Sequence, residues 1–143
     1  MTQNVTIFKS IKDTDTPFFR DIRQILLRIK DGSETTKELV KKIRQEKRKP
    51  ERQELKKELP AICFSGTFNK RTDASLIQHS GFICLDFDGY AKTKELLQDK
   101  ENLTKNKYVF SVFISPSGNG LKVIVKIPAD AENHTNYFNS LEK

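Results

Sequence analysis

The segment Ser80–Asp88, with the sequence SGFICLDFD, constrains the fold more than any other part of this chain. Its apolar and aromatic residues predict a sheet strand. Alternate residues of a strand point to opposite faces of the sheet. One face of this strand is wholly apolar, with Ile83, Leu85 and Phe87. The other face begins apolar and ends in two carboxylates, in the order Phe82, Cys84, Asp86 and Asp88.

Two further strands follow near the C-terminus of the 143-residue chain. They are predicted at Lys107–Ser115 and Gly120–Ile127, and the residues between them are Pro116, Ser117, Gly118 and Asn119. Four connecting residues of this chemistry favour a β-hairpin.

The N-terminal part of the chain alternates strand and helix signals. Asn4–Phe8 and Ala61–Phe64 are predicted strands, and Ser65-Gly66-Thr67 is predicted to end the second one. Pro17 can open a helix at its first position. An apolar stripe at helical spacing is predicted to be the buried face of that helix; its members are Ile22, Ile25, Leu26 and Ile29.

Further helices are expected along the rest of the chain. Gly32 would stop the first helix, and Ser33 would cap a second one with the apolar contacts Leu39, Val40 and Ile43. Later helices are expected at Ala91–Leu103 and Asn133–Glu142. This order predicts an α+β fold with a mixed or antiparallel sheet and helices packed on it. We expect a single domain over residues 1–143, mostly helical and basic up to 59 and sheet-rich from 60 onward, where the candidate site lies.

The stretch Lys41–Glu58 is almost wholly charged, and the chain as a whole has a formal net charge of +7. The stretch is either a solvated helical surface with ion pairs between successive turns, or a basic arm that contacts a nucleic-acid backbone. The candidate nucleic-acid contacts are Lys47, Arg48, Lys49, Lys70 and Arg71.

The two cysteines, Cys63 and Cys84, lie in separate apolar runs without a CxxC pair. We expect reduced, buried thiols, which fits a cytoplasmic protein. The N-terminus does not resemble a signal peptide, and no stretch approaches the roughly 18 apolar residues of a membrane span. We therefore expect no membrane partner.

Asp86 and Asp88 are candidate metal ligands. Their Cα atoms should lie about 6.6 Å apart on one strand. Two carboxylates at that distance on a half-buried face repel each other and resist desolvation, and a bound cation removes both penalties. Carboxylate pairs hold Mg²⁺ or Mn²⁺ against substrate phosphates. The alternative is a strand that simply ends in solvent.

The loop from Ser115 to Lys122, SPSGNGLK, is a candidate phosphate site. Gly118 and Gly120 permit backbone conformations that can form a concave anion site. Ser115 and Ser117 offer hydroxyl donors, and Lys122 adds a positive charge suited to phosphate. The alternative is an ordinary hairpin turn. The carboxylate pair and the loop together predict a nucleotide site, with nucleoside triphosphate as ligand.

At these residues the chain resembles the N-terminal domain of bacterial virulence-associated-E-type proteins, which is similar to the archaeo-eukaryotic primase–polymerase superfamily. The resemblance covers VTIFKSIKD, LPAICFSGTF, HSGFICLDFDG and FISPSGNGLKVIV, the last two being the most specific. It implies that Asp86 and Asp88 are the catalytic, metal-binding acidic pair and that SPSGNGLK is the nucleotide-binding segment. It further implies metal-dependent nucleotidyl transfer in DNA replication of a bacterium or mobile element. The partners that it implies are nucleic acid, chiefly DNA, and a helicase-like ATPase in cis or in trans.

The chain departs from the superfamily pattern in two ways. Lys122 stands where a His is usual, and the usual third acidic residue has no candidate in a strand-like run. The acids downstream of the loop are Asp130, Glu132 and Glu142. These departures lead us to expect a domain truncated at its C-terminus. They also keep open a catalytically inactive module that binds nucleic acid or a protein partner.

A third alternative is a phosphatase of the haloacid-dehalogenase type. The motif CLDFDG looks like its first motif, with a nucleophilic Asp followed two residues later by an acid Asp. That fold needs alternating strands and helices after the motif. The predicted hairpin takes their place.

Overall fold

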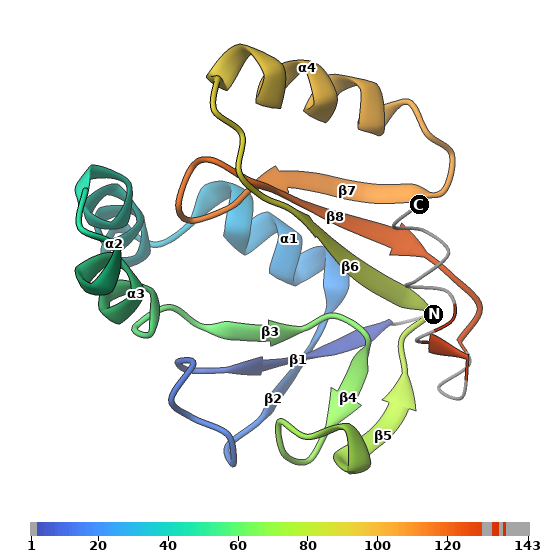
Figure 1. Ribbon diagram of the computed structural model, residues 1–143. Coiled ribbons are helices and arrows are strands. Elements are labelled where there is room, and N and C mark those ends of the chain that lie inside the picture. The colour runs from blue at the N-terminus through green and yellow to red at the C-terminus, as the bar shows by residue number, and fades with distance from the viewer. Residues whose placement is uncertain (1–2, 130–132, 135, 137–143) are drawn as a thin grey trace. The chain divides into compact units, whose positions relative to one another are not determined.

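The computed structural model describes residues 3–129, 133–134 and 136. Its described residues form an α+β fold with three antiparallel sheets and four α-helices, as Figure 1 shows, and this confirms the predicted fold class. The chain divides into two compact units, an N-terminal unit, Met1–Ser80, and a C-terminal unit, Gly81–Lys143. The expectation that they form a single domain stays a prediction.

The main sheet of the N-terminal unit has the order β2-β1-β3, with all strands antiparallel; they are β1 (Asn4–Phe8), β2 (Phe18–Asp21) and β3 (Ala61–Cys63). A second sheet pairs β4 (Gly66–Phe68) with β5 (Leu76–His79), and a short 3₁₀ turn, Asp73–Ser75, precedes β5. Thr6 of β1 is fully buried. Its hydroxyl donates to the Gly66 carbonyl at 2.9 Å and accepts from the Phe68 amide at 3.0 Å. This side chain therefore ties the central strand of the first sheet to the second sheet.

The structure corrects two local predictions in this unit. Pro17 does not open a helix, because Phe18–Asp21 pairs with β1 as a strand. Phe, a good strand former, can extend the sheet there. The segment Ser65-Gly66-Thr67 does not only end a strand, since Gly66 already begins β4. β4 and β5 are short and pair across a register shift, so they carry little periodic signal.

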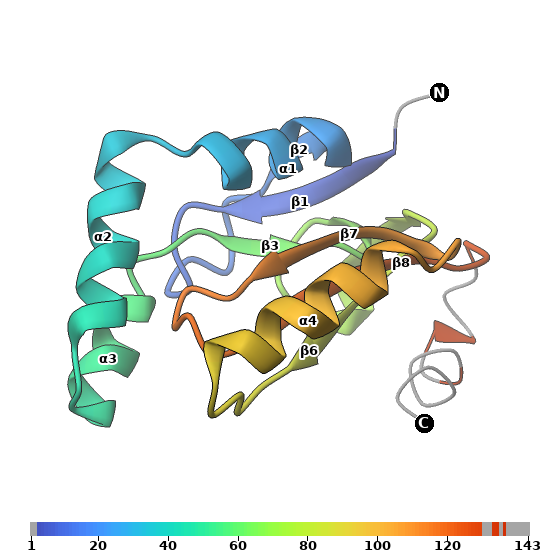
Figure 2. The same cartoon turned by 90° about the horizontal axis from the view of Figure 1, so that it is seen from above.

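Three helices complete the N-terminal unit: α1 (Ile22–Asp31), α2 (Glu34–Gln45) and α3 (Lys49–Lys56). The first helix is capped by the Asp21 carboxylate, which accepts from the Arg23 amide at 2.9 Å. Gly32 ends it at a φ of 60°, a conformation that disfavours side chains, and the Ser33 hydroxyl caps α2 as predicted. Figures 1 and 2 show α2 and α3 side by side.

The predicted apolar stripe of α1 is only partly buried. Ile22 and Ile25 are buried, whereas Ile29 is 36% exposed. The stripe therefore covers the N-terminal half of the helix, and its last member faces the surface beside α2, where it lines a groove with Val40.

Within the C-terminal unit, the described residues form a three-stranded antiparallel sheet of order β6-β8-β7 with the helix α4 packed on it. The bounds of these elements are β6 (Phe82–Phe87), α4 (Thr93–Thr104), β7 (Val109–Ile114) and β8 (Leu121–Lys126). The predicted hairpin is confirmed, because β7 and β8 pair antiparallel. Figure 2 shows α4 lying along this sheet.

The alternation predicted for the Ser80–Asp88 segment is confirmed by the packing. Ile83 and Leu85 of β6 form a buried cluster with Val123 and Val125 of β8. Partly buried residues packed against this cluster include Phe87, Leu103 of α4 and Val112 of β7. The opposite face carries Asp86 and Lys122 at the strand end.

The predicted final helix, Asn133–Glu142, falls mostly outside the described residues. Among the helices that the structure does describe, none has the length and apolarity needed to cross a bilayer.

Candidate functional site

Asp86 and Lys122 meet across the β6–β8 pair. The register places them directly opposite each other, and the Lys122 Nζ donates to Asp86 Oδ1 at 3.0 Å. The Asp86 side chain is 52% exposed and the Lys122 side chain is 33% exposed. An ion pair this exposed contributes at most about 1 kcal/mol to stability. The pair is therefore accessible to a ligand that offers either side chain a stronger partner.

Asp88 meets the hairpin loop at Gly120. A Cβ added to Gly120 would lie 2.6 Å from Asp88 Oδ1, 3.0 Å from the Phe87 carbonyl oxygen and 3.1 Å from Ser115 Oγ. Only glycine fits without movement of these atoms. The Asp88 carboxylate, just after β6, thus lies over the loop, close to the buried hydroxyl of Ser115. Sequence reasoning predicted both features, and the hairpin register brings them to the same sheet end.

The hairpin loop is closed by its own backbone hydrogen bonds. The Ser115 amide donates to the Gly120 carbonyl at 2.9 Å, and the Gly118 amide donates to the Ser115 carbonyl at 2.9 Å. Gly118 has a φ of 84°, so a side chain at this position would strain the turn. Ser117 is half-buried in the turn. The Ser115 and Gly118 amides are therefore engaged within the loop.

Tyr90 links the site to α4, a contact that sequence reasoning missed. Its amide donates to the Asn119 carbonyl at 3.0 Å, and its hydroxyl donates to Asp99 Oδ2 at 2.8 Å. Burial and the hydrogen bond to Asp99 raise the pKa of Tyr90 to about 12. The segment after β6 is thereby held against the loop on one side and the helix on the other. In the sequence, this contact is indicated only by the position of Tyr90 directly after the Gly89 turn.

Cys84 lies beside the ion pair, with its Sγ 3.9 Å from Asp86 Oδ1. Burial and the neighbouring Asp86 carboxylate raise the pKa of this thiol to about 12. The thiol is therefore protonated at neutral pH and is a poor nucleophile.

The donor chemistry at the strand end suits a hard divalent cation. Asp86 and Asp88 supply carboxylate oxygens, which Mg²⁺ and Mn²⁺ prefer, and substrate phosphates commonly complete such sites. The residues described in the structure contain no cluster of three or more His, Cys, Asp or Glu side chains suited to a metal. Asp130, Glu132 and Glu142 lie outside them. Two carboxylates fill only part of the coordination shell of such a cation, so the aspartates fit a metal whose other ligands include water or a bound phosphate.

The weaker nucleic-acid candidates belong to the N-terminal unit, whereas the carboxylates and the loop belong to the C-terminal unit. Lys47, Arg48 and Lys49 lie at the junction of α2 and α3, where Arg48 pairs with Glu46 at 3.3 Å and with Glu51 at 3.7 Å. Lys70 and Arg71 lie in the connection between β4 and β5, and the Arg71 amide donates to the Thr14 carbonyl at 3.0 Å.

The fold and the site define an α+β protein with an acidic strand end facing a glycine-containing hairpin loop. The sequence model of the family described as BT4734-like, N-terminal domain, matches residues 54–143. The chain belongs to this family. Searches of curated proteins and of solved structures give no significant match. The matched region contains the whole C-terminal unit and begins within α3, so α1 and α2 lie outside it.

Proposed function

We propose that this chain is a primase–polymerase-like domain of the virulence-associated-E type, which binds a nucleoside triphosphate together with Mg²⁺ or Mn²⁺. The observation that carries the proposal is the juxtaposition of Asp88 with Gly120 and Ser115 beside the Asp86–Lys122 pair. Two carboxylates, a hydroxyl and an ammonium at one sheet end are the groups that a metal–triphosphate needs.

Each of these side chains has a distinct task in the proposal. Asp86 and Asp88 hold the cation, and Lys122 turns from Asp86 to a phosphate oxygen when the ligand enters. Ser115 and Ser117 donate hydrogen bonds near the phosphates, and Gly118 and Gly120 let the backbone approach closely. A bound divalent cation supplies charge neutralisation of the phosphates.

The proposed reaction is nucleotidyl transfer, in which a 3′ hydroxyl attacks the α-phosphate in line and pyrophosphate leaves. The protein contributes positioning and electrostatic stabilisation. Two carboxylates can orient one cation, whereas activation of the hydroxyl needs further ligands. We therefore expect the chain to bind nucleotide but to synthesise primers only weakly. Nucleotide binding is for that reason the better test of the site. The cellular setting in this proposal is the cytoplasm, in DNA replication of a bacterium or mobile element, alongside a helicase-like ATPase in cis or in trans.

A titration of fluorescent nucleoside triphosphate with and without Mn²⁺ tests the proposal. Wild-type protein should bind with Mn²⁺ and lose most binding without it. Asp86→Asn with Asp88→Asn should abolish the Mn²⁺-dependent part, because the neutral amides cannot replace the charge of two carboxylates. Glu95→Gln with Glu101→Gln, on the exposed surface of α4, is the matched control and should bind like wild type. Wild-type affinity in the Asp86/Asp88 variant would refute the site.

The second candidate function is a non-catalytic module that binds nucleic acid or a protein partner. The Asp86–Lys122 ion pair favours it, because Lys122 already compensates one of the carboxylates without a metal. Such a module would bind an oligonucleotide equally well with and without Mn²⁺, and would show no Mn²⁺-dependent nucleotide binding. The phosphatase alternative gains no support, because the chain continues after α4 as the antiparallel β7–β8 hairpin, where that fold needs further strand–helix units.

A further inference from the structure

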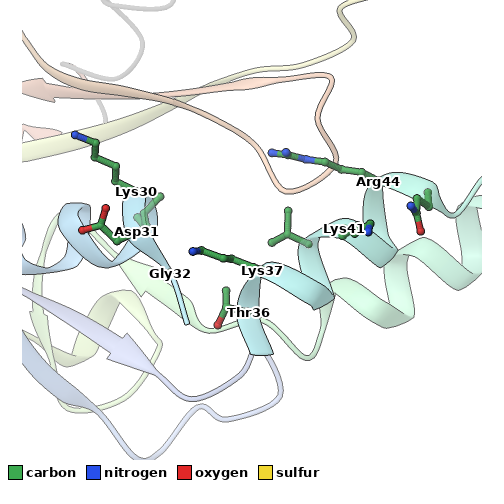
Figure 3. Close-up of a pocket in the computed structure, with 10 residues that line it drawn as sticks. Lys30, Asp31, Gly32, Thr36, Lys37, Lys41 and Arg44 are labelled. Carbon is green, nitrogen blue, oxygen red and sulfur yellow. The ribbon is translucent and has the colours of Figure 1, made fainter. Parts of the chain in front are cut away.

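The N-terminal unit contains a groove between the end of α1 and the face of α2, shown in Figure 3. Its volume is about 510 Å³, within the range of ligand sites. Ile29 and Val40 supply apolar surface. The charged side chains that line it are four cations and a single acid, namely Lys30, Lys37, Lys41, Arg44 and Asp31. This surface is called the basic groove below.

The cations of the basic groove come from two helices. Lys30 stands in the last turn of α1, whereas Lys37, Lys41 and Arg44 recur at intervals of four and three residues along α2 (Figure 3). Residues at this spacing share one helix face. Over seven residues the row extends about 10 Å. Phosphates of one nucleic-acid strand recur at about 3.4 Å along a duplex axis, so the row spans a few consecutive phosphates.

The positive charge of the three lysines that line the groove is little compensated. Among the residues that the structure describes, Lys30 and Lys41 form no ion pair. Lys37 pairs with Glu34 at 3.9 Å, but these side chains are 57% and 89% exposed, so the pair is weak. By contrast, Arg48 at the α2–α3 junction pairs with two glutamates. An anion that binds these lysines therefore displaces little existing structure.

The helix dipoles favour an anion at the α2 end of the groove and disfavour one at the α1 end. Thr36, in the first turn of α2, lines the groove, and a helix N-terminus favours negative charge. The C-terminus of α1 has the opposite polarity, and Lys30 there offsets it. The strongest anion-binding potential thus lies along α2.

From these observations we infer that the basic groove binds the phosphodiester backbone of a nucleic acid. Its occupant is a polyanion with regularly spaced charges, since the cations of α2 form a linear row and do not surround a single point. Lysine and arginine contacts to phosphate are independent of sequence, so binding here positions the strand without selecting bases. This surface takes Lys41 and Arg44 from the charged stretch Lys41–Glu58, but it excludes the Lys47–Lys49 candidates and adds Lys30 and Lys37. It does not depend on nucleotide binding by the C-terminal unit.

Binding of a labelled single-stranded DNA oligonucleotide to the full chain tests the inference. The groove variant carries Lys37→Gln, Lys41→Gln and Arg44→Gln, and glutamine keeps helix propensity high. A matched control removes three exposed cations in and around α4, with Lys92→Gln, Lys94→Gln and Lys105→Gln, and so has the same net charge. A third variant replaces Lys47, Arg48 and Lys49 by Gln. Equal unfolding midpoints should show that every variant is folded.

We expect the groove variant to lose about tenfold or more in affinity and about two units of the log–log salt slope, near 0.7 for each lost phosphate contact on a single strand. The other two variants should lose much less. Equal losses in the groove variant and the α4 control, or a loss confined to the Lys47–Lys49 variant, would overturn the inference.

Two further arms identify the source of the phosphates. A duplex of the same sequence that shows the same dependence on the groove residues supports a backbone site indifferent to strand number. Inorganic triphosphate that displaces the oligonucleotide at equal phosphate concentration would instead make the groove a triphosphate site and overturn the assignment to nucleic acid.

Discussion

The two charged surfaces of this protein differ in how their charge is balanced. In the C-terminal unit, Lys122 lies 3.0 Å from Asp86 and compensates it across a strand pair. In the N-terminal unit, the basic groove gathers four cations around one acid. A balanced site holds together without a ligand and must give up an internal contact to bind one. An unbalanced groove attracts a polyanion at long range and loses that attraction as salt rises.

The largest expected effect concerns the steric fit at the balanced site. Gly120→Ala should lower the free energy of unfolding by about 2 kcal/mol, because its Cβ would collide with a backbone carbonyl and two side chains. It should also weaken Mn²⁺-dependent nucleotide binding by displacing Asp88. Urea unfolding and the nucleotide titration measure the two effects.

Gly89→Ala is the control for this prediction. A Cβ at Gly89 meets no atom within 4 Å, although the φ of 81° adds backbone strain. Gly89→Ala should lower the free energy of unfolding by about 1 kcal/mol and leave nucleotide affinity close to wild type. A Gly120→Ala protein that binds nucleotide as wild type does would show that Asp88 need not lie against the loop.

Removal of the balancing cation is the next largest change. Lys122→Met should tighten Mn²⁺ binding in the absence of nucleotide, because the ammonium no longer competes for Asp86, and should weaken nucleotide binding about tenfold through loss of a phosphate contact. Isothermal titration with Mn²⁺ and then with nucleotide separates these opposite effects.

Lys126→Met is matched to it, since Lys126 lies on the same strand and face but contacts the Phe110 ring, with Nζ 5.2 Å from the ring centroid. It should change neither affinity. A loss of Mn²⁺ affinity in Lys122→Met would contradict the idea that Lys122 competes with a metal.

A smaller effect concerns the contact between the site and α4. Tyr90→Phe removes a hydrogen bond to Asp99 and should destabilise the protein by about 1 kcal/mol at neutral pH. The pKa of Tyr90 is raised from 10.0 to about 12, so the folded state holds its proton more tightly than the unfolded state. This contribution is complete below pH 10 and is lost as pH rises toward 12.

The difference in unfolding free energy between wild type and Tyr90→Phe should therefore shrink across that range. Chemical denaturation at pH 7, 9, 10 and 11 measures it. Tyr108→Phe, at a residue that is 57% exposed, should show no such trend. A difference that stays constant up to pH 11 would mean that Tyr90 does not titrate as its environment indicates.

The smallest effect is expected in the basic groove. Glu34→Gln removes the partner of Lys37 and should raise oligonucleotide affinity about twofold, with a stability change of a few tenths of a kcal/mol. Glu54→Gln removes a similar pair to Lys57, at 2.8 Å on α3 and outside the groove, and should leave affinity unchanged. Equal gains in both variants would indicate a response to net charge alone.

The sequence alone determined much of the C-terminal unit. The two-residue alternation gives β6 one wholly apolar face, and the turn residues Pro116–Asn119 separate the last two predicted strands. These features leave few alternatives, because a strand with a buried face cannot slip its register cheaply. The same alternation predicted which face carries Asp86. Whether Asp86, Asp88 and the loop residues act on a nucleotide stays a prediction.

The tertiary structure alone decided the contacts between residues that are distant in the sequence. The pairing of Phe18–Asp21 with β1 overrode the helix signal at Pro17, and Ile29 reached the surface although its spacing predicted burial. The register that sets Lys122 against Asp86, and the groove that the end of α1 forms with α2, depend on how elements pack. Local sequence records the propensity and periodicity of each element, whereas the partner of a charged side chain is set by neighbours that the chain brings together only on folding.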